Sequence, residues 1–312
     1  MNALGQFRIP FVFILDFEEK KCRVYPINEV PETIKFNFRG QSNYSAPPPN
    51  NTPYRFVKNP ISIDQYQKAF NQVLFELNYG NSFLLNLTFK TPINSDLSLN
   101  DIFFRSKAKY KLWIENHCVV FSPETFIKIE AGQIYSYPMK GTIAADQHSA
   151  AKVLLDDDKE KSEHFTIVDL IRNDLSMIAS EVRVPHFRYL EKIDSGQQNL
   201  LQASSEIMGR LTPDYHDQLG NIIFKLLPAG SISGAPKAKT VDIIQIVEDG
   251  PRGYYTGIMG MYDGQDLDSA VMIRYIEKDG DQMYYRSGGG ITHLSELHAE
   301  YQEMIDKVYL PF

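Results

Sequence analysis

Cysteine is scarce in this chain, and its scarcity excludes two kinds of protein. Only Cys22 and Cys118 occur among the 312 residues. Two cysteines cannot build a disulfide framework, and they cannot supply the ligands of a cysteine-based zinc site. The sequence therefore predicts reduced thiols and a cytoplasmic location.

The chain also lacks a long apolar run and an excess of positive charge. Its N-terminal apolar stretch, Ile9 to Leu15, is too short to span a bilayer and is followed by Asp16. It has no basic leader and no small-residue cleavage site, so we expect a strand there and no membrane partner. The net charge of -7 disfavours a nucleic-acid partner, because such a partner needs a basic surface. A small anionic substrate needs only a local positive pocket.

The pattern of apolar and turn-forming residues predicts consecutive strands with scattered helices. Ser62 and Gln65 form a capping box at the start of a helix that should end near Gly80. The proline-rich segment 45–51 predicts an exposed connector. The other expected elements are strands at 11–17, 21–25, 82–91, 255–262, 270–277 and 282–286, three strands within 110–137, and helices at 158–179 and 295–308. This mixture predicts an α+β fold with largely antiparallel sheet.

Two of the expected helices carry the same pair of carboxylates. Glu160 and Glu163 lie three residues apart on the first, and Glu300 and Glu303 repeat the spacing on the second, followed by Lys307. Residues three apart share one face of a helix. Mg²⁺ takes one or two protein carboxylates and fills its shell with water and substrate oxygens, so these residues could hold one ion. The alternative is two solvated helix faces, because Glu-x-x-Glu is common.

Two glycine-rich segments are further candidates. The run 228–237, which includes Ser233, precedes an expected helix whose free amides would favour an anion such as a carboxylate. Gly288, Gly289 and Gly290 directly follow an expected strand and allow backbone N–H groups to turn toward a ligand. Neither segment matches a phosphate-binding or dinucleotide-binding fingerprint. Tight turns are the alternative for both.

One lysine stands in an unusual setting. Lys140 lies between an apolar strand and Gly141. Burial lowers the pKa of a lysine side chain, and the neutral amine is a usable nucleophile. A surface lysine beside a turn is the alternative.

Taken in order, these strings resemble the chorismate-utilising enzymes, a family that includes anthranilate synthase component I, isochorismate synthase and aminodeoxychorismate synthase component I. The resemblance covers residues 62 to 310 and is carried by the segments 122–124, 138–142, 160–175, 228–237, 252–260 and 288–307. It implies a sandwich of two largely antiparallel sheets with flanking helices, like that of anthranilate synthase component I, and an active site between the sheets. It also implies one chorismate-binding domain over 1–312, with a reduced N-terminal hairpin and connector in 1–60 and a catalytic core in 62–310.

The resemblance implies a role for each carboxylate of the two pairs. Glu163 and Glu303 would bind Mg²⁺ directly, and Glu160 and Glu300 would support them through water or hydrogen bonds. The metal would hold the ring carboxylate of chorismate. Lys307 would lie beside that carboxylate.

The organic substrate would be bound by a second group of residues. Arg274 and Tyr255 would bind the enolpyruvyl carboxylate, and Glu124 would be the general acid that protonates the departing C4 hydroxyl. Gln202 stands where relatives often carry a histidine, and glutamine is no useful proton donor, which shifts that role to Glu124. The remaining substrate-binding candidates are Thr142, Ser233, Gly288, Gly289 and Gly290.

Two positions separate the members of the family. This chain has Leu84 where isochorismate and salicylate synthases carry a lysine base, and it has Lys140 where anthranilate synthases carry alanine. The resemblance therefore favours aminodeoxychorismate synthase component I, in the folate and para-aminobenzoate pathway, over anthranilate synthase component I or an isochorismate-type enzyme. In the implied reaction Lys140 attacks C2 of chorismate while the C4 hydroxyl leaves, and ammonia then adds at C4 and expels the lysine.

The source of the ammonia is not evident within the chain. Neither Cys22 nor Cys118 lies in a glycine-rich elbow with a paired histidine, as a glutaminase nucleophile would require. We therefore expect a separate glutamine amidotransferase subunit as partner. A third hypothesis is a non-catalytic chorismate-binding protein or scaffold, but binding alone would not need Lys140.

Overall fold

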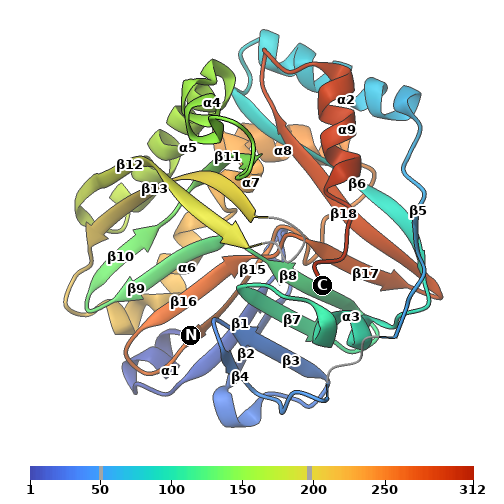
Figure 1. Ribbon diagram of the computed structural model, residues 1–312. Coiled ribbons are helices and arrows are strands. Elements are labelled where there is room, and N and C mark those ends of the chain that lie inside the picture. The colour runs from blue at the N-terminus through green and yellow to red at the C-terminus, as the bar shows by residue number, and fades with distance from the viewer. Residues whose placement is uncertain (49–51, 195–198) are drawn as a thin grey trace. The chain divides into compact units, whose positions relative to one another are not determined.

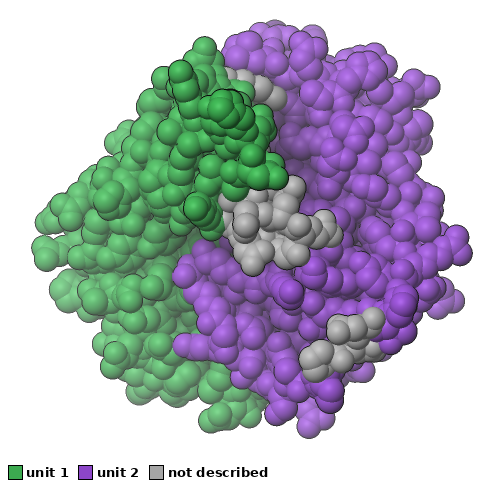
Figure 2. Space-filling model, viewed as in Figure 1, with its two compact units in different colours: residues 1–30, 124–231, 257–271 green, residues 31–123, 232–256, 272–312 purple. Residues whose placement is uncertain are grey.

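The structure is a computed structural model that describes residues 1–48, 52–194 and 199–312 (Figure 1). The chain divides into two compact units, which Figure 2 colours separately. Unit 1 comprises Met1–Val30, Glu124–Ser231 and Gly257–Val271; unit 2 comprises Pro31–Pro123, Ile232–Thr256 and Met272–Phe312. Each unit is therefore built from three separate stretches of the chain.

Unit 1 is built on an antiparallel sheet. Its strands, in spatial order, are β11 (Met139–Ala144), β13 (Asn199–Arg210), β10 (Gln133–Ser136), β9 (Thr125–Glu130), β16 (Leu267–Val271), β15 (Ile258–Tyr262), β1 (Phe11–Leu15) and β2 (Cys22–Pro26). A long strand, β12 (Ser180–Asp194), pairs with β13. All five residues of β1 are buried, which explains why its sequence is continuously apolar rather than alternating.

Helices of unit 1 pack on the β11 and β13 end of this sheet and near the N-terminus. They are α1 (Asn2–Gln6), η1 (Ile27–Glu29), α4 (Ala150–Asp156), α5 (Asp158–Ser176), η2 (Tyr215–Gln218) and α6 (Leu219–Leu226). The helix α5 contacts β11, β12 and β13. It begins where the carboxylate of Asp157 accepts a hydrogen bond from the backbone N–H of Glu160 at 2.8 Å. This cap stabilises the first turn of α5, which carries Glu160 of the first carboxylate pair.

Unit 2 is built on a second antiparallel sheet. Its strands, in spatial order, are β14 (Gly234–Ala235), β6 (Leu84–Ser95), β18 (Gln282–Ile291), β17 (Tyr275–Asp279), β8 (Cys118–Ser122), β7 (Tyr110–Ile114), β3 (Ile34–Phe38) and β4 (Gln41–Ser42), with β5 (Phe56–Lys58) on β6. Its helices are α2 (Ile63–Asn78), α3 (Leu99–Arg105), α8 (Lys237–Val247) and α9 (Leu297–Asp306). The short helix α7 (Gly230–Ser233) joins the two units along the chain. The helices α2, α8 and α9 pack on β6 and β18, while α3 packs on β7 and β8.

The capping box expected at Ser62 is confirmed. Its hydroxyl accepts from the backbone N–H of Gln65, whose side chain accepts in return from the backbone of Ser62. Among the described residues, none of the helices combines the length and apolarity that crossing a bilayer requires.

Three sequence-based expectations were wrong in their details. The expected strand 270–277 is two strands in different units, because Arg274 has a left-handed backbone, with φ +53°, that interrupts the extended chain. The glycines 288–290 do not follow a strand but lie inside β18, opposite residues 86–88 of β6. The segment 110–137 contains four strands instead of three, and the long pair β12 and β13 was not expected at all.

Gly234, in the glycine-rich run, occupies a position that excludes any side chain. Its φ is +121°, and a Cβ there would collide with the carbonyl oxygen of Leu84 on β6. We expect Gly234→Ala to lower the free energy of unfolding by about 3 kcal/mol or more. The control is Gly280→Ala, at a φ of +58° with no atom within 4 Å, which should cost only about 1 to 2 kcal/mol. Equal losses in urea unfolding would show that the close approach of β14 to β6 is unimportant.

Lys111 is a buried cation of unit 2. It lies in β7 with 7% of its surface exposed, and its Nζ donates to the carbonyl oxygens of Phe103 at 2.7 Å and Ser106 at 2.9 Å. These carbonyls lie at the C-terminal end of α3, where a helix leaves acceptors open. Burial lowers the pKa of Lys111 from 10.5 to about 8.

This lowered pKa predicts a pH-dependent stability. Between pH 8 and 10.5 the unfolded chain keeps the proton of Lys111 and the folded chain releases it. The stability that this group contributes should therefore rise with pH over the interval, by at most about 1.4 kcal/mol per pH unit. The unfolding free energy of wild type minus that of Lys111→Met, measured from pH 7 to 10.5, should rise with pH. Parallel curves would contradict this account.

Candidate functional site

Lys140 and Glu163 form an ion pair in unit 1. Lys140 lies on β11 and Glu163 on α5, which packs against that strand. The Nζ of Lys140 lies 3.1 Å from Oε2 of Glu163, and the two side chains are 20% and 8% exposed. A largely buried ion pair is more than a surface contact, because each charge depends on the other for compensation. The contact disfavours the alternative of a simple surface lysine.

Glu160 lies beside the same stretch of β11. The strand has an irregularity in its pairing with β13 between Lys140 and Thr142, where Gly141 has a φ of +77°. A Cβ on Gly141 would come within 3.2 Å of Oε2 of Glu160. The structure thus brings together Lys140, Glu160 and Glu163. The side chain of Thr142 lies outside the described residues.

A buried histidine next to this group was missed by the sequence analysis. Nε2 of His164 lies 2.6 Å from the hydroxyl oxygen of Ser205, which also accepts from the backbone N–H of Arg188. Burial, then the charges of Arg188 and Lys140, lower the pKa of His164 to about 4. A neutral imidazole therefore connects α5 to Ser205 of β13, whose hydroxyl oxygen also contacts β12 at Arg188. The signal in the sequence that could have found it is its place inside segment 160–175 of the family resemblance.

Gln202 lies on β13, opposite Thr142 of β11 and Glu191 of β12. Its Oε1 is buried and has no hydrogen-bond partner among the described residues. An orphaned acceptor in a buried position is costly unless a ligand or water satisfies it. This side chain is therefore suited to receive a donor.

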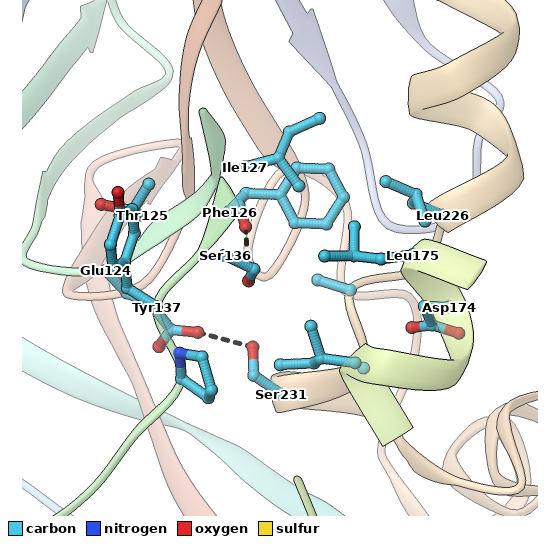
Figure 3. Close-up of a pocket in the computed structure, with 14 residues that line it drawn as sticks. Glu124, Thr125, Phe126, Ile127, Ser136, Tyr137, Asp174, Leu175, Leu226 and Ser231 are labelled. Carbon is cyan, nitrogen blue, oxygen red and sulfur yellow. Dashed lines mark hydrogen bonds between the residues drawn. The ribbon is translucent and has the colours of Figure 1, made fainter. Parts of the chain in front are cut away.

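Glu124 lines a pocket of unit 1 (Figure 3). Its Oε1 accepts a hydrogen bond from the hydroxyl of Ser231 at 2.5 Å, and Tyr137 and Asp174 also line the pocket. The residues lining it do not include Lys140. The candidate acid is thus held by a hydroxyl donor, which favours one orientation of its carboxyl group.

In unit 2 the second carboxylate pair lies against the glycines of β18. A Cβ on Gly289 would lie 3.3 Å from Oε2 of Glu300 and 3.4 Å from Oε1 of Glu303. Glu300 is buried and accepts a hydrogen bond from the hydroxyl of Ser295 at 2.7 Å. Both carboxylates therefore lie close to Gly289. A residue with a side chain at this position would crowd them.

Two basic residues complete this group. The Nζ of Lys307 lies 2.6 Å from Oε1 of Glu303 and donates to the carbonyl oxygen of Gly288 at 2.7 Å. Arg274 donates to the carbonyl oxygen of Lys307 at 2.7 Å. The structure thus brings together Glu300, Glu303, Lys307, Arg274 and the glycines of β18.

Tyr255 and Ser233 are buried in the same unit. The ring of Tyr255 lies 5.8 Å from the guanidinium carbon of Arg286, and burial raises the pKa of its hydroxyl to about 12. Its phenol therefore stays protonated at neutral pH and can donate a hydrogen bond. Ser233 is completely buried at the end of α7.

A sequence model of a family described as chorismate binding enzyme matches residues 12–311. The chain belongs to the chorismate binding enzyme family. The resemblance carried by the six segments is therefore confirmed.

Individual relatives of this chorismate binding enzyme place it within the family. An uncharacterised PabA-like protein of Pasteurella multocida is 50% identical over 313 residues, which cover 99% of this chain and 96% of that protein. Aminodeoxychorismate synthase component 1 of Salmonella typhimurium is 30% identical over 280 residues, which cover 83% of this chain and 60% of that protein. The crystal structure of anthranilate synthase component I from Streptococcus pneumoniae matches with a TM-score of 0.69 and 27% identity, over 82% of this chain and 59% of that chain. The expected α+β fold of the anthranilate synthase component I type is confirmed.

The two carboxylate pairs of this chorismate binding enzyme carry oxygen atoms, the ligand type of a hard cation. Glu160 lies near Gly141, and Glu300 and Glu303 lie near Gly289. Their carboxylate oxygens are the kind of ligand that Mg²⁺ prefers. Among the described residues, no set of three or more His, Cys, Asp or Glu side chains is placed to hold a metal ion. Each pair taken by itself can therefore supply only one or two ligands, and substrate oxygens and water would have to complete the shell.

Proposed function

We propose that this chain is an aminodeoxychorismate synthase component I, which converts chorismate and ammonia to 4-amino-4-deoxychorismate in folate and para-aminobenzoate biosynthesis. The observation that carries the proposal is the amine of Lys140, held on β11 at 3.1 Å from Glu163. A protein that only bound chorismate would have no use for a nucleophile there. The similarity to aminodeoxychorismate synthase component 1 of Salmonella typhimurium supports the same choice.

The proposed reaction has two displacements. Lys140 first releases its proton to water, and its neutral amine attacks C2 of chorismate. The ring double bonds then shift, and the C4 hydroxyl leaves as water with a proton from Glu124. Hydroxide is a poor leaving group, so a positioned acid is needed. Ammonia then adds at C4 and expels the lysine as a free amine. The hydrogen bond from Ser231 would keep the carboxyl group of Glu124 in place between turnovers.

The substrate carboxylates would be bound mainly by residues of unit 2. Arg274 and the hydroxyl of Tyr255 would donate to the enolpyruvyl carboxylate, together with backbone amides of the glycines in β18. Ser233 and Lys307 would add a hydroxyl and a positive charge. Gln202, with its buried and unsatisfied Oε1, would accept from a substrate hydroxyl.

Magnesium is part of this proposal. Glu163 and Glu303 would be its direct ligands, and Glu160 and Glu300 would support them. When bound, the ion would orient the ring carboxylate and offset its negative charge.

The ammonia would come from a separate glutamine amidotransferase subunit. Cys118 is buried in β8, and Cys22 is exposed on β2. Neither position resembles the strained elbow that presents a nucleophilic cysteine beside a histidine. In vitro, free ammonium at high concentration should supply the ammonia in place of this subunit.

Product analysis tests the proposed function directly. The purified chain is incubated with chorismate, Mg²⁺ and ammonium, and the products are identified by mass spectrometry. The proposal requires 4-amino-4-deoxychorismate as the main product. Anthranilate or isochorismate as the main product would assign the chain to another branch of the family.

A further inference from the structure

A buried ion pair of unit 2 has no role in the reaction described above. Arg252 is 1% exposed and Glu248 is 8% exposed, so both charges are removed from water. Nε of Arg252 donates to Oε2 of Glu248 at 2.8 Å, and Nη2 donates to Oε1 at 2.6 Å. This two-point contact fixes the plane of the guanidinium as well as its position. It also places the remaining donors of Arg252 in defined directions.

The ion pair holds β6 at two residues. Glu248 accepts hydrogen bonds from the backbone N–H and the hydroxyl of Thr88, both at 2.9 Å. Arg252 donates to the carbonyl oxygen of Asn86 at 2.6 Å. In the sheet, Thr88 lies opposite Gly288 and Asn86 lies opposite Gly290. The ion pair therefore fixes the strand against which the glycines of β18 are aligned.

The same guanidinium holds two further segments. Nη1 of Arg252 donates to the carbonyl oxygen of Ile232, the residue before Ser233, at 3.0 Å. It also lies 3.4 Å from the hydroxyl of Thr256. Thr256 has a φ of +60°, unusual for a β-branched residue, and its hydroxyl donates to the carbonyl oxygen of Tyr255 at 2.6 Å. Surrounding contacts must maintain such a backbone.

We propose that Glu248 and Arg252 are positioning residues for the enolpyruvyl carboxylate of chorismate. They hold Tyr255, Ser233 and the β18 glycines in a fixed mutual arrangement without contacting the substrate. The identity of that ligand rests on the proposed function. An arginine is required because one planar group must donate to Glu248, Asn86 and Ile232 at once, which the single amine of a lysine cannot do.

The test compares chorismate binding by wild type and Arg252→Lys. Lysine preserves the charge but loses the two-point contact and most of the backbone contacts. We expect the dissociation constant for chorismate, measured by isothermal titration calorimetry with Mg²⁺ and without ammonium, to rise at least about tenfold. In assays with ammonium, KM for chorismate should rise by a similar factor while kcat changes little. A purely structural role would lower the melting temperature and leave the affinity of the folded protein unchanged.

Two further variants keep the inference falsifiable. Thr88→Val removes the hydroxyl contact to Glu248 and preserves the shape of the side chain, so it should raise the dissociation constant for chorismate by a smaller factor. If Arg252→Lys does not fold, Thr88→Val is the variant that tests the inference. Lys111→Met, which removes another buried cation of unit 2, should leave the affinity unchanged. Unchanged affinity in folded Arg252→Lys or Thr88→Val overturns the inference. Absence of the amination product in wild type instead contradicts the proposed function, because binding is measured without ammonia.

Discussion

Lys140→Met should slow formation of 4-amino-4-deoxychorismate by at least about a hundredfold, or roughly 3 kcal/mol in barrier height. Methionine has nearly the length of lysine and can lie along the same path on β11, but it has no amine to attack C2. The variant would also leave Glu163 without its ion-pair partner. Initial rates with saturating chorismate, Mg²⁺ and ammonium, followed by mass spectrometry, measure the effect.

The matched control for this variant is Lys128→Met in the same sheet. Lys128 lies on β9 and forms an ion pair with Glu130 at 2.7 Å, in which the glutamate is 51% exposed. Exposed pairs of this kind contribute little to stability. The control rate should stay within about twofold of wild type. Slow residual amination by Lys140→Met is compatible with direct addition of ammonia, whereas a rate close to wild type would remove the lysine from the mechanism.

Local features of the fold could be predicted because they depend on neighbours in sequence. The capping box at Ser62 and the buried stripe of α2, formed by Tyr66, Phe70, Val73 and Leu77, follow from spacing alone, and both are present. The apolar run after Pro10 likewise forms β1. In each case the residues that decide the structure lie within one helix turn or one strand.

Features that depend on distant contacts could not be predicted in the same way. The glycines 288–290 read as a turn, but the β6 backbone opposite them leaves no room for a side chain at Gly288, where a Cβ would collide with the carbonyl oxygen of Leu87. Their place inside a strand therefore depends on a segment about 200 residues away. Arg274 interrupts the expected strand 270–277 through a left-handed backbone conformation that its residue type does not predict.

The candidate site also contains features that depend on neighbours in sequence and features that depend on distant contacts. The glutamate pairs and Lys140 could be found from spacing and from family motifs, because each is a short string. The supporting contacts could not be found this way. His164 needs Ser205, 41 residues away, and Glu248 needs Thr88, 160 residues away, before either has a defined role. The candidate reactive groups were thus visible in the sequence, while the contacts of His164 and Glu248 became visible only through packing.

Glu163→Gln and Glu303→Gln should each weaken Mg²⁺ binding in the presence of chorismate by at least about tenfold. Glutamine keeps the shape of the side chain but removes the charge, and even residues that only support a metal ligand typically contribute 10- to 100-fold to affinity. Isothermal titration calorimetry at fixed chorismate gives both values. Glu130→Gln, on an exposed side chain of β9, is the control and should leave the affinity unchanged.

The double variant Glu163→Gln/Glu303→Gln decides whether the two carboxylate pairs serve one ion. If both glutamates bind the same Mg²⁺, losing the first already disrupts the shared shell, so the combined loss of affinity should differ from the sum of the single losses by about 0.5 kcal/mol or more. One binding event per chain should be seen in wild type. Two events, or strictly additive losses, would mean that each pair acts independently. In that case the proposed reaction would lack the single shared ion that it assigns to Glu163 and Glu303.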